Sequence, residues 1–103
     1  MTWNPTADVD EQVRKWMKTL GWQVTRTEYG ARSRVYGWRH EAPGHPAYTL
    51  RISRKVLEIY PAFVVLYHLD RLRVSAAMRK NPAARLVVRQ KAAAVVLEEV
   101  PAD

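Results

Sequence analysis

The stretch that most constrains the fold runs from residue 61 to residue 80, and proline marks both of its ends. Pro61 suits the first position of a helix, where its missing N–H would have no partner within the helix. Asn81-Pro82 ends a helix, because proline lacks the backbone donor and clashes with the preceding turn. The sequence therefore predicts one central helix over residues 61–80, after a short turn that begins near Arg54.

Apolar side chains cover two adjoining arcs of this predicted helix at 100° per residue. The first arc consists of Ala62, Val65, Leu66, Leu69, Leu72, Ala76 and Ala77, and the second of Phe63, Tyr67, Val74 and Met78. A helix with so wide an apolar surface packs on more than one side. The sheet and the C-terminal hairpin could cover both arcs, or a partner subunit in a homodimer could cover one of them.

The second arc and the charged pair beside it form the candidate interface of such a homodimer. Asp70 and Arg73 are three residues apart, so their side chains can meet on the helix surface. A structural ion pair is the commoner role for two such charges, and contact with a partner or a ligand is the alternative. The candidate interface comprises Phe63, Tyr67, Asp70, Arg73, Val74 and Met78.

The remaining elements follow from periodicity and turn signals. Asp8 and Glu11 have the spacing of a capping box, and apolar residues recur at helical spacing until Gly21, which predicts a helix over residues 8–20. Alternating segments predict strands at residues 22–29, 32–40 and 47–53.

Residues 84–100 have two interpretations, which the sequence leaves open. Val-Val pairs at 87–88 and 95–96 favour a β-hairpin that turns at Gln90-Lys91, and the alanines favour a helix. With the hairpin, the order is α-β-β-β-α-β-β. This order predicts a single small α+β domain over residues 1–103, with helices packed on an antiparallel sheet.

The order α-β-β-β-α between residues 8 and 79 is similar to that of double-stranded RNA-binding domains. Ser53-Arg54-Lys55 begins the second helical segment with basic residues. The lysine-rich signature of that family is absent, and Pro61 interrupts the segment where its second helix would continue. The resemblance therefore covers the element order, which by itself implies no function.

The charge of the chain favours an anionic partner. Seventeen basic and ten acidic residues give a net charge of +7, and twelve of the basic residues are arginine. Residues 22–60 carry seven bases and three acids, and residues 71–91 carry seven bases and no acid. Such a segregated excess favours a nucleic acid, an acidic protein or an anionic surface as the partner.

The segment with the strongest functional signal is residues 26–39, in which arginines are interleaved with Tyr29, Tyr36 and Trp38. Arginines suit phosphates, and aromatic rings suit unpaired bases. The alternative is that the aromatics belong to the core and the arginines only solvate the sheet. The candidate nucleic-acid-binding residues are Arg26, Arg32, Arg34, Tyr36, Trp38, Arg39, Arg51, Arg54 and Lys55.

A second basic patch surrounds Asn81-Pro82. It either extends the same electropositive surface or forms a solvated rim, which is the usual role of exposed charges. Its members are Arg79, Lys80, Arg85, Arg89 and Lys91.

The sequence contains no recognisable catalytic, metal or cofactor motif. Cysteine is absent, which excludes disulfides and thiolate metal sites and is typical of a cytoplasmic protein. His40, His45 and Glu41 are too few for a zinc site, and no serine or carboxylate pair has a catalytic setting. No stretch is long and apolar enough to span a membrane. We therefore expect no enzyme activity, no metal, no cofactor and no membrane partner.

Two functions remain after these exclusions. The first is binding of DNA or RNA through the Arg/aromatic hairpin face, in a protein that could be a homodimer. The second is a protein-interaction, adaptor or inhibitor module that docks on an acidic partner through the basic face or the apolar central helix.

Overall fold

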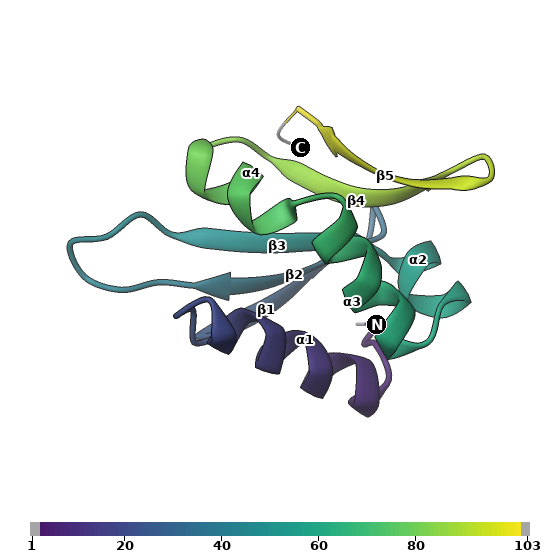
Figure 1. Ribbon diagram of the computed structural model, residues 1–103, viewed down its shortest axis with the longest axis horizontal. Coiled ribbons are helices and arrows are strands. Elements are labelled where there is room, and N and C mark those ends of the chain that lie inside the picture. Colours follow the sequence, from purple (N-terminus) through teal and green to yellow (C-terminus); the bar gives the residue numbers. More distant parts are fainter. Residues whose placement is uncertain (1–2, 102–103) are drawn as a thin grey trace.

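The computed structural model describes residues 3–101, which form a five-stranded sheet with helices packed on one of its faces (Figure 1). The helices are α1 (Ala7–Thr19), α2 (Arg54–Ile59), α3 (Ala62–Arg71) and α4 (Val74–Lys80). The strands are β1 (Arg26–Gly30), β2 (Val35–His40), β3 (Tyr48–Ser53), β4 (Leu86–Lys91) and β5 (Ala94–Glu99). The predicted α+β class is confirmed.

Helix α1 agrees with the prediction within one residue at each end. Thr6, and not Asp8, is its N-cap, and the Thr6 hydroxyl accepts a hydrogen bond from the Val9 N–H at 3.3 Å. Gly21 follows the C-cap with a φ of 83°, a conformation that glycine adopts without steric cost. The chain therefore turns sharply from α1 toward the sheet.

The strands lie in the order β1-β2-β3-β4-β5. All neighbouring pairs are antiparallel except β3 and β4, which run parallel and are in register at Ile52 and Val88. The sheet is therefore mixed, where the sequence predicted an antiparallel one. The physical reason is the crossover through α2, α3 and α4, because such a connection returns the chain in the same direction.

The first two strands are shorter than predicted. Strand β1 begins at Arg26, because Trp22 is buried and stacks on Tyr48 with 4.4 Å between ring centroids. Strand β2 begins at Val35, because residues 31–34 form the β1–β2 turn and Arg34 has a φ of 55°. Arg32 and Arg34 therefore lie in a turn and not on a strand.

The predicted central helix is two helices, α3 and α4, and the residues before it form a separate short helix, α2. The break lies at Arg73, which has φ 53° and ψ 44° in the left-handed region. Such a conformation costs a non-glycine residue about 1–2 kcal/mol. In return, the new helix direction buries Val74 and Met78, which a straight helix would have carried on its second arc.

The C-terminal segment is a hairpin, so of the two interpretations the helix was wrong. The pairing of Lys91 with Ala94 places the turn at Ala92 and Ala93, two residues after the predicted turn. Ala92 adopts a φ of 54° there.

The core lies between the helices and one face of the sheet. Trp38 is fully buried, and its indole N–H donates to Oδ1 of Asp10 in α1 at 2.9 Å. The other large side chains of this core that are almost completely buried are Met17, Leu50, Ile52, Leu69, Val13, Val56, Val65, Val74 and Val88. This core uses one face of the sheet, and no described helix packs on the opposite face.

Candidate functional site

The face of the sheet opposite the helices is the candidate site, and we call it the open face. Alternation along the strands places Tyr36 and Trp38 in the core, so the residues between them point the other way. The open face comprises Arg26, Glu28, Gly30, Val35, Gly37, Arg39, Thr49, Arg51, Ser53, Val87, Arg89, Lys91, Ala94, Val96 and Glu98. Val35 and Val87 are buried outside the main core, so each places an apolar side chain among the charged side chains of this face.

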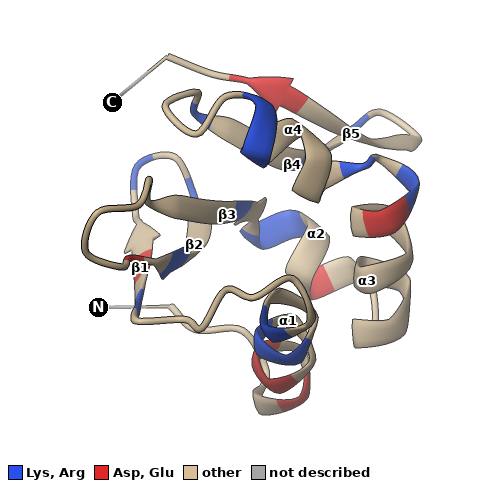
Figure 2. Cartoon of the chain, turned by 60° about the vertical axis from the view of Figure 1, so that its left-hand side comes forward, with Lys and Arg blue, Asp and Glu red and all other residues tan. Residues whose placement is uncertain are grey.

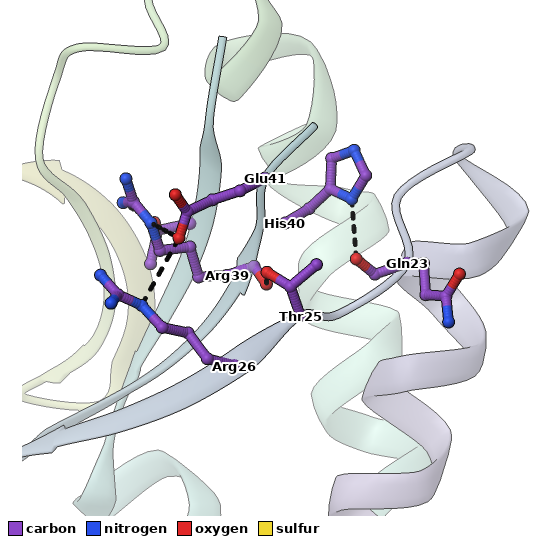
Figure 3. A network of polar contacts seen from close by, with 7 residues as sticks. Gln23, Thr25, Arg26, Arg39, His40 and Glu41 are labelled. Carbon is purple, nitrogen blue, oxygen red and sulfur yellow. Dashed lines mark hydrogen bonds and ion pairs between the residues drawn. The ribbon is translucent and has the colours of Figure 1, made fainter. Parts of the chain in front are cut away.

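Arg26 and Arg39 lie directly opposite each other on β1 and β2. Glu41 lies between their side chains, as Figure 3 shows, with its Oε1 2.9 Å from Nε of Arg39 and 3.6 Å from Nε of Arg26. Arg39 also donates from Nη1 to the Thr49 hydroxyl at 3.0 Å. One carboxylate is therefore shared by two guanidinium groups, and this corner of the open face keeps a positive charge.

Arg51 on β3 is the central cation of the open face. Burial, followed by the charge of Arg85, lowers the pKa of Arg51, with Glu28 acting in the opposite direction. The charge of Arg39 lowers the same pKa further. The guanidinium of Arg51 makes no hydrogen bond or ion pair within the described part of the chain. Like charges are thus held near one another on a half-buried surface.

Two hollows adjoin Arg51 and Arg85. The first, which we call the three-arginine hollow, measures about 490 Å³ and is lined by Arg39, Arg51, Arg85, Pro46, Ala47, Thr49, Pro82, Ala83 and Ala84. No carboxylate is among these described lining residues. The second, which we call the glycine hollow, measures about 200 Å³ and is lined by Glu28, Tyr29, Gly30, Val35, Gly37, Arg51 and Arg85. The first hollow is suited to an anion, because three cations line it.

A third hollow, the hairpin hollow, lies where the β1–β2 turn approaches α2 and β4. It measures about 300 Å³ and is lined by Ser33, Arg34, Ser53, Arg54, Lys55, Glu58, Arg89 and Gln90. Arg54 pairs with Glu58 at 3.2 Å and lies over the Trp3 ring at 5.2 Å. Ser53 and Arg89 also belong to the open face, so the basic surface continues from one region to the other.

The structure thus divides the residues that the sequence grouped as nucleic-acid-binding. Arg26, Arg39 and Arg51 lie on the open face, and Arg34, Arg54 and Lys55 line the hairpin hollow. Arg32 is exposed in the β1–β2 turn.

Tyr36 and Trp38 lie in the core, with exposed fractions of 4% and 0%. No base can stack on either ring in this position, so the stacking role predicted for them is wrong. The sequence had offered the correct alternative, in which these aromatics belong to the core.

The second basic patch is also divided. Arg85 and Arg89 join the open face, and Nη1 of Arg89 lies 2.9 Å from Oε1 of Glu98. The hydrogen bond from Lys91, above all, lowers the pKa of Glu98. Arg79 faces α1 instead, where it donates to the Leu20 carbonyl at 3.2 Å and lies over the Trp22 ring at 5.0 Å. Lys80 ends α4 as an exposed residue, and Figure 2 shows the basic end of this helix.

The candidate interface residues separate in the same way. Phe63 and Tyr67 are 74% and 60% exposed, while Val74 and Met78 are buried. Asp70 does not pair with Arg73; its Oδ1 accepts a hydrogen bond from the Trp16 indole N–H at 3.0 Å.

Ile59, which the sequence reasoning did not select, is the third exposed large apolar side chain among residues 3–101, with an exposed fraction of 51%. Glu28, Gly37 and Thr49 were missed as well. Their signal was present in the alternation of the strands, which places them beside Arg39 and Arg51.

The described residues contain no group of three or more His, Cys, Asp or Glu side chains that could hold a metal ion. His40 donates from Nδ1 to the Gln23 carbonyl at 2.7 Å, which Figure 3 shows at the edge of the sheet. Burial, and next the charge of Arg71, lower the pKa of His68. These histidines have structural neighbours and do not converge on one point.

Comparison of the chain with protein-family models, with curated proteins and with solved structures found no significant match. Within residues 3–101, no helix has the length and apolar character needed to cross a membrane. The case for a function therefore rests on the geometry of the open face.

Proposed function

We propose that this protein binds nucleic acid through phosphate contacts on the open face of its sheet. The observation that carries the proposal is the three-arginine hollow, which Arg39, Arg51 and Arg85 line together and beside which Arg51 makes no hydrogen bond or ion pair within the described residues. Arginine's planar fork matches the oxygens of a phosphate, and phosphate contacts supply most of the affinity of sequence-independent binding.

The energetics of the cluster support an anionic ligand. Burial and neighbouring cations oppose the charge of Arg51, so the ligand-free protein holds that charge at a cost in folding free energy. A phosphate in the hollow would add an anion beside Arg51, and its charge would stabilise the guanidinium that Arg85 and Arg39 now repel. Its contact with a half-buried guanidinium would also be less screened than a contact on an open surface.

The surface extends far enough for more than one phosphate. Arg89 and Ser53 link the open face to the hairpin hollow, where Arg34 and Lys55 add two cations that make no ion pair in the described structure. A nucleic-acid strand that crosses the sheet from Arg39 toward Lys55 would therefore meet cations in both hollows, with the carboxylates of Glu58 and Glu98 beside Arg54 and Arg89.

The test measures the binding of fluorescent DNA and RNA, single- and double-stranded, by anisotropy at several salt concentrations. The open-face variant carries Arg39→Gln, Arg51→Gln and Arg85→Gln. The matched control carries Arg14→Gln, Lys15→Gln and Lys18→Gln on α1, where two of the three cations pair with acids four residues away. Both variants lower the net charge by three.

We expect the open-face variant to lose at least tenfold in affinity and about two in the slope of log K against log salt. The control variant should stay close to the wild type, and circular dichroism should show both variants folded. Equal losses in the two variants would contradict the proposal, because they would mean that only the total charge matters.

A second candidate function is supported by a different observation, the exposure of Ile59, Phe63 and Tyr67 on α2 and α3. Arg71 and Arg73 follow these apolar residues and are exposed, so the surface suits an acidic protein partner with an apolar centre. The double variant Phe63→Ser and Tyr67→Ser should then abolish binding of that partner and leave binding of nucleic acid unchanged. Sedimentation of the wild type separates this case from a homodimer.

A further inference from the structure

We propose that the outer edge of β5 pairs with β5 of a second copy of this chain and joins the two sheets into one. Strand β5 ends the strand order, so within residues 3–101 it has a neighbouring strand on one side only (Figure 1). The unpaired backbone groups of an edge strand are a template for another strand, and proteins commonly block them with lysine or proline. Neither residue type occurs between Ala94 and Glu99, where Val95, Val96 and Leu97 form an apolar centre of high β propensity.

The ladder between β4 and β5 shows which backbone groups of β5 point outward. The Val100 N–H donates to the Arg85 carbonyl at 2.9 Å, and pairs that exchange such hydrogen bonds alternate along an antiparallel ladder. Every second residue of β5 therefore bonds to β4. The residues between them, Val95, Leu97 and Glu99, direct their N–H and C=O groups away from the sheet.

Arg71 confirms this direction and places a cation at one end of the edge. Its Nη2 donates to the Val95 carbonyl at 2.9 Å, so a guanidinium from α3 reaches the outer side of β5. Val95 is part of the core, so by alternation Glu99 lies on the same, helix-covered face of the sheet. Glu99 is exposed, and its carboxylate makes no hydrogen bond or ion pair among the described residues. The edge thus has a cation at one end and an available carboxylate at the other.

These two charges select a second copy as the partner and fix its register. When two β5 strands pair antiparallel about Leu97, Val95 of each copy lies opposite Glu99 of the other. The outward N–H and C=O groups then meet in hydrogen-bonded pairs, and the Glu99 carboxylate of each copy reaches Arg71 of the other. A register centred on Glu99 would instead place two carboxylates opposite each other and Pro101, which has no N–H, opposite Leu97.

The symmetry of this pair also determines how the open faces are arranged. The two-fold axis of an antiparallel strand pair is perpendicular to the sheet, so both open faces lie on the same side. The dimer would therefore present two three-arginine hollows on one continuous surface. The pairing itself needs no nucleic acid, so it goes beyond the proposed function and is tested independently of it.

The experiment is sedimentation equilibrium of the wild-type chain and three variants in the absence of nucleic acid. We expect the wild type to dimerise in the micromolar range, and Glu99→Arg to weaken the dimer at least about tenfold by placing a cation against Arg71. The double variant Arg71→Glu with Glu99→Arg exchanges the two charges and should regain most of this loss. Glu11→Arg makes the same change of charge at an exposed site on α1 and should dimerise like the wild type.

Amide hydrogen exchange provides a second readout, which does not depend on a variant. The Leu97 N–H should exchange more slowly as the protein concentration rises, whereas the Val96 N–H, which bonds to β4, should be protected at every concentration. A wild type that stays monomeric at about 100 µM would overturn the proposal. A dimer that survives Glu99→Arg and leaves the Leu97 N–H unprotected would also overturn it. Loss of the dimer in Glu99→Arg without recovery in the folded double variant would overturn the proposed register.

Discussion

The two faces of the sheet are built from the same strands and carry opposite kinds of side chain. On β2, Tyr36 and Trp38 enter the core, while Gly37 and Arg39 point to the open face. On β3, Leu50 is buried and Arg51 keeps a charge beside other cations. One face is packed by apolar burial, and the other holds groups that burial and mutual repulsion disfavour.

This difference indicates how a small protein can stay folded while it carries a charged surface. A large share of its apolar burial comes from the contact between the helices and one face, where Trp38 also satisfies its indole N–H through Asp10. The open face can then carry a cost of the order of 1 kcal/mol for the charged surface that we propose binds anions. The contrast makes quantitative predictions for each face.

The largest effect is expected on the core face. Trp38→Ala should lower the free energy of unfolding by about 3–5 kcal/mol, because it leaves a cavity and removes the indole donor to Oδ1 of Asp10. Urea denaturation measures this loss. Phe63→Ala, which removes an exposed ring, should change the same free energy by less than about 0.5 kcal/mol. Similar losses in the two variants would break the distinction between core and surface.

A moderate effect is expected where the open face is most closely packed. Gly37→Val should destabilise the fold by about 1–3 kcal/mol, because its side chain would displace Glu28 and Thr49. Gly37→Ala provides a graded comparison with a smaller loss of stability. An unchanged stability for Gly37→Val would show that the hollow does not have the shape described.

A smaller effect of opposite sign is expected for the central cation. Arg51→Met keeps the length of the side chain and removes the charge, so it should raise the free energy of unfolding by up to about 1 kcal/mol after allowance for solvent screening. The same variant should bind nucleic acid more weakly. Arg14→Met, which breaks the ion pair with Asp10, should give no such gain. A destabilised Arg51→Met would mean that the charge supports the fold.

The smallest effect is expected from the titration of His68, which lies in α3 on the core side of the sheet. The folded state lowers the pKa of His68, so the unfolded chain takes up the proton first, near its usual pKa of about 6.5. The free energy of unfolding should therefore fall as the pH drops from about 6.5 through the lower pKa of the folded state. His68→Gln should flatten this part of the profile in denaturation experiments at pH 7.5 and 5.5, run at ~0.1 M salt. An identical profile for both proteins would contradict the assignment.

Local rules predicted the parts of the fold that depend on neighbours in sequence. Periodicity and Gly21 located α1, and alternation located β3 within one residue at its start. The break at Arg73 had no such signal, because no glycine or proline marks it. It arises from the burial of Val74 and Met78, which is a property of the assembled core.

The sequence predicted only part of the candidate site, because local patterns do not show which face of the sheet the helices cover. Arg39 and Arg51 were chosen from the charge pattern, but Tyr36 and Trp38 were wrongly given to the same surface. The alternation separates aromatics from Arg39 on β2, yet it does not say which side the helices cover. Arg85 reaches Arg51 only through the parallel pairing of β3 and β4, which no local pattern predicts.

The most direct test of the central claim is a titration of ¹⁵N-labelled protein with a short single-stranded oligonucleotide, followed by amide chemical shifts. The account predicts that the largest shifts occur at Gly37, Arg39 and Arg51 on the open face, and that Phe63 and Tyr67 stay unchanged. Shifts confined to α3, or no shifts at low salt, would contradict binding through the open face.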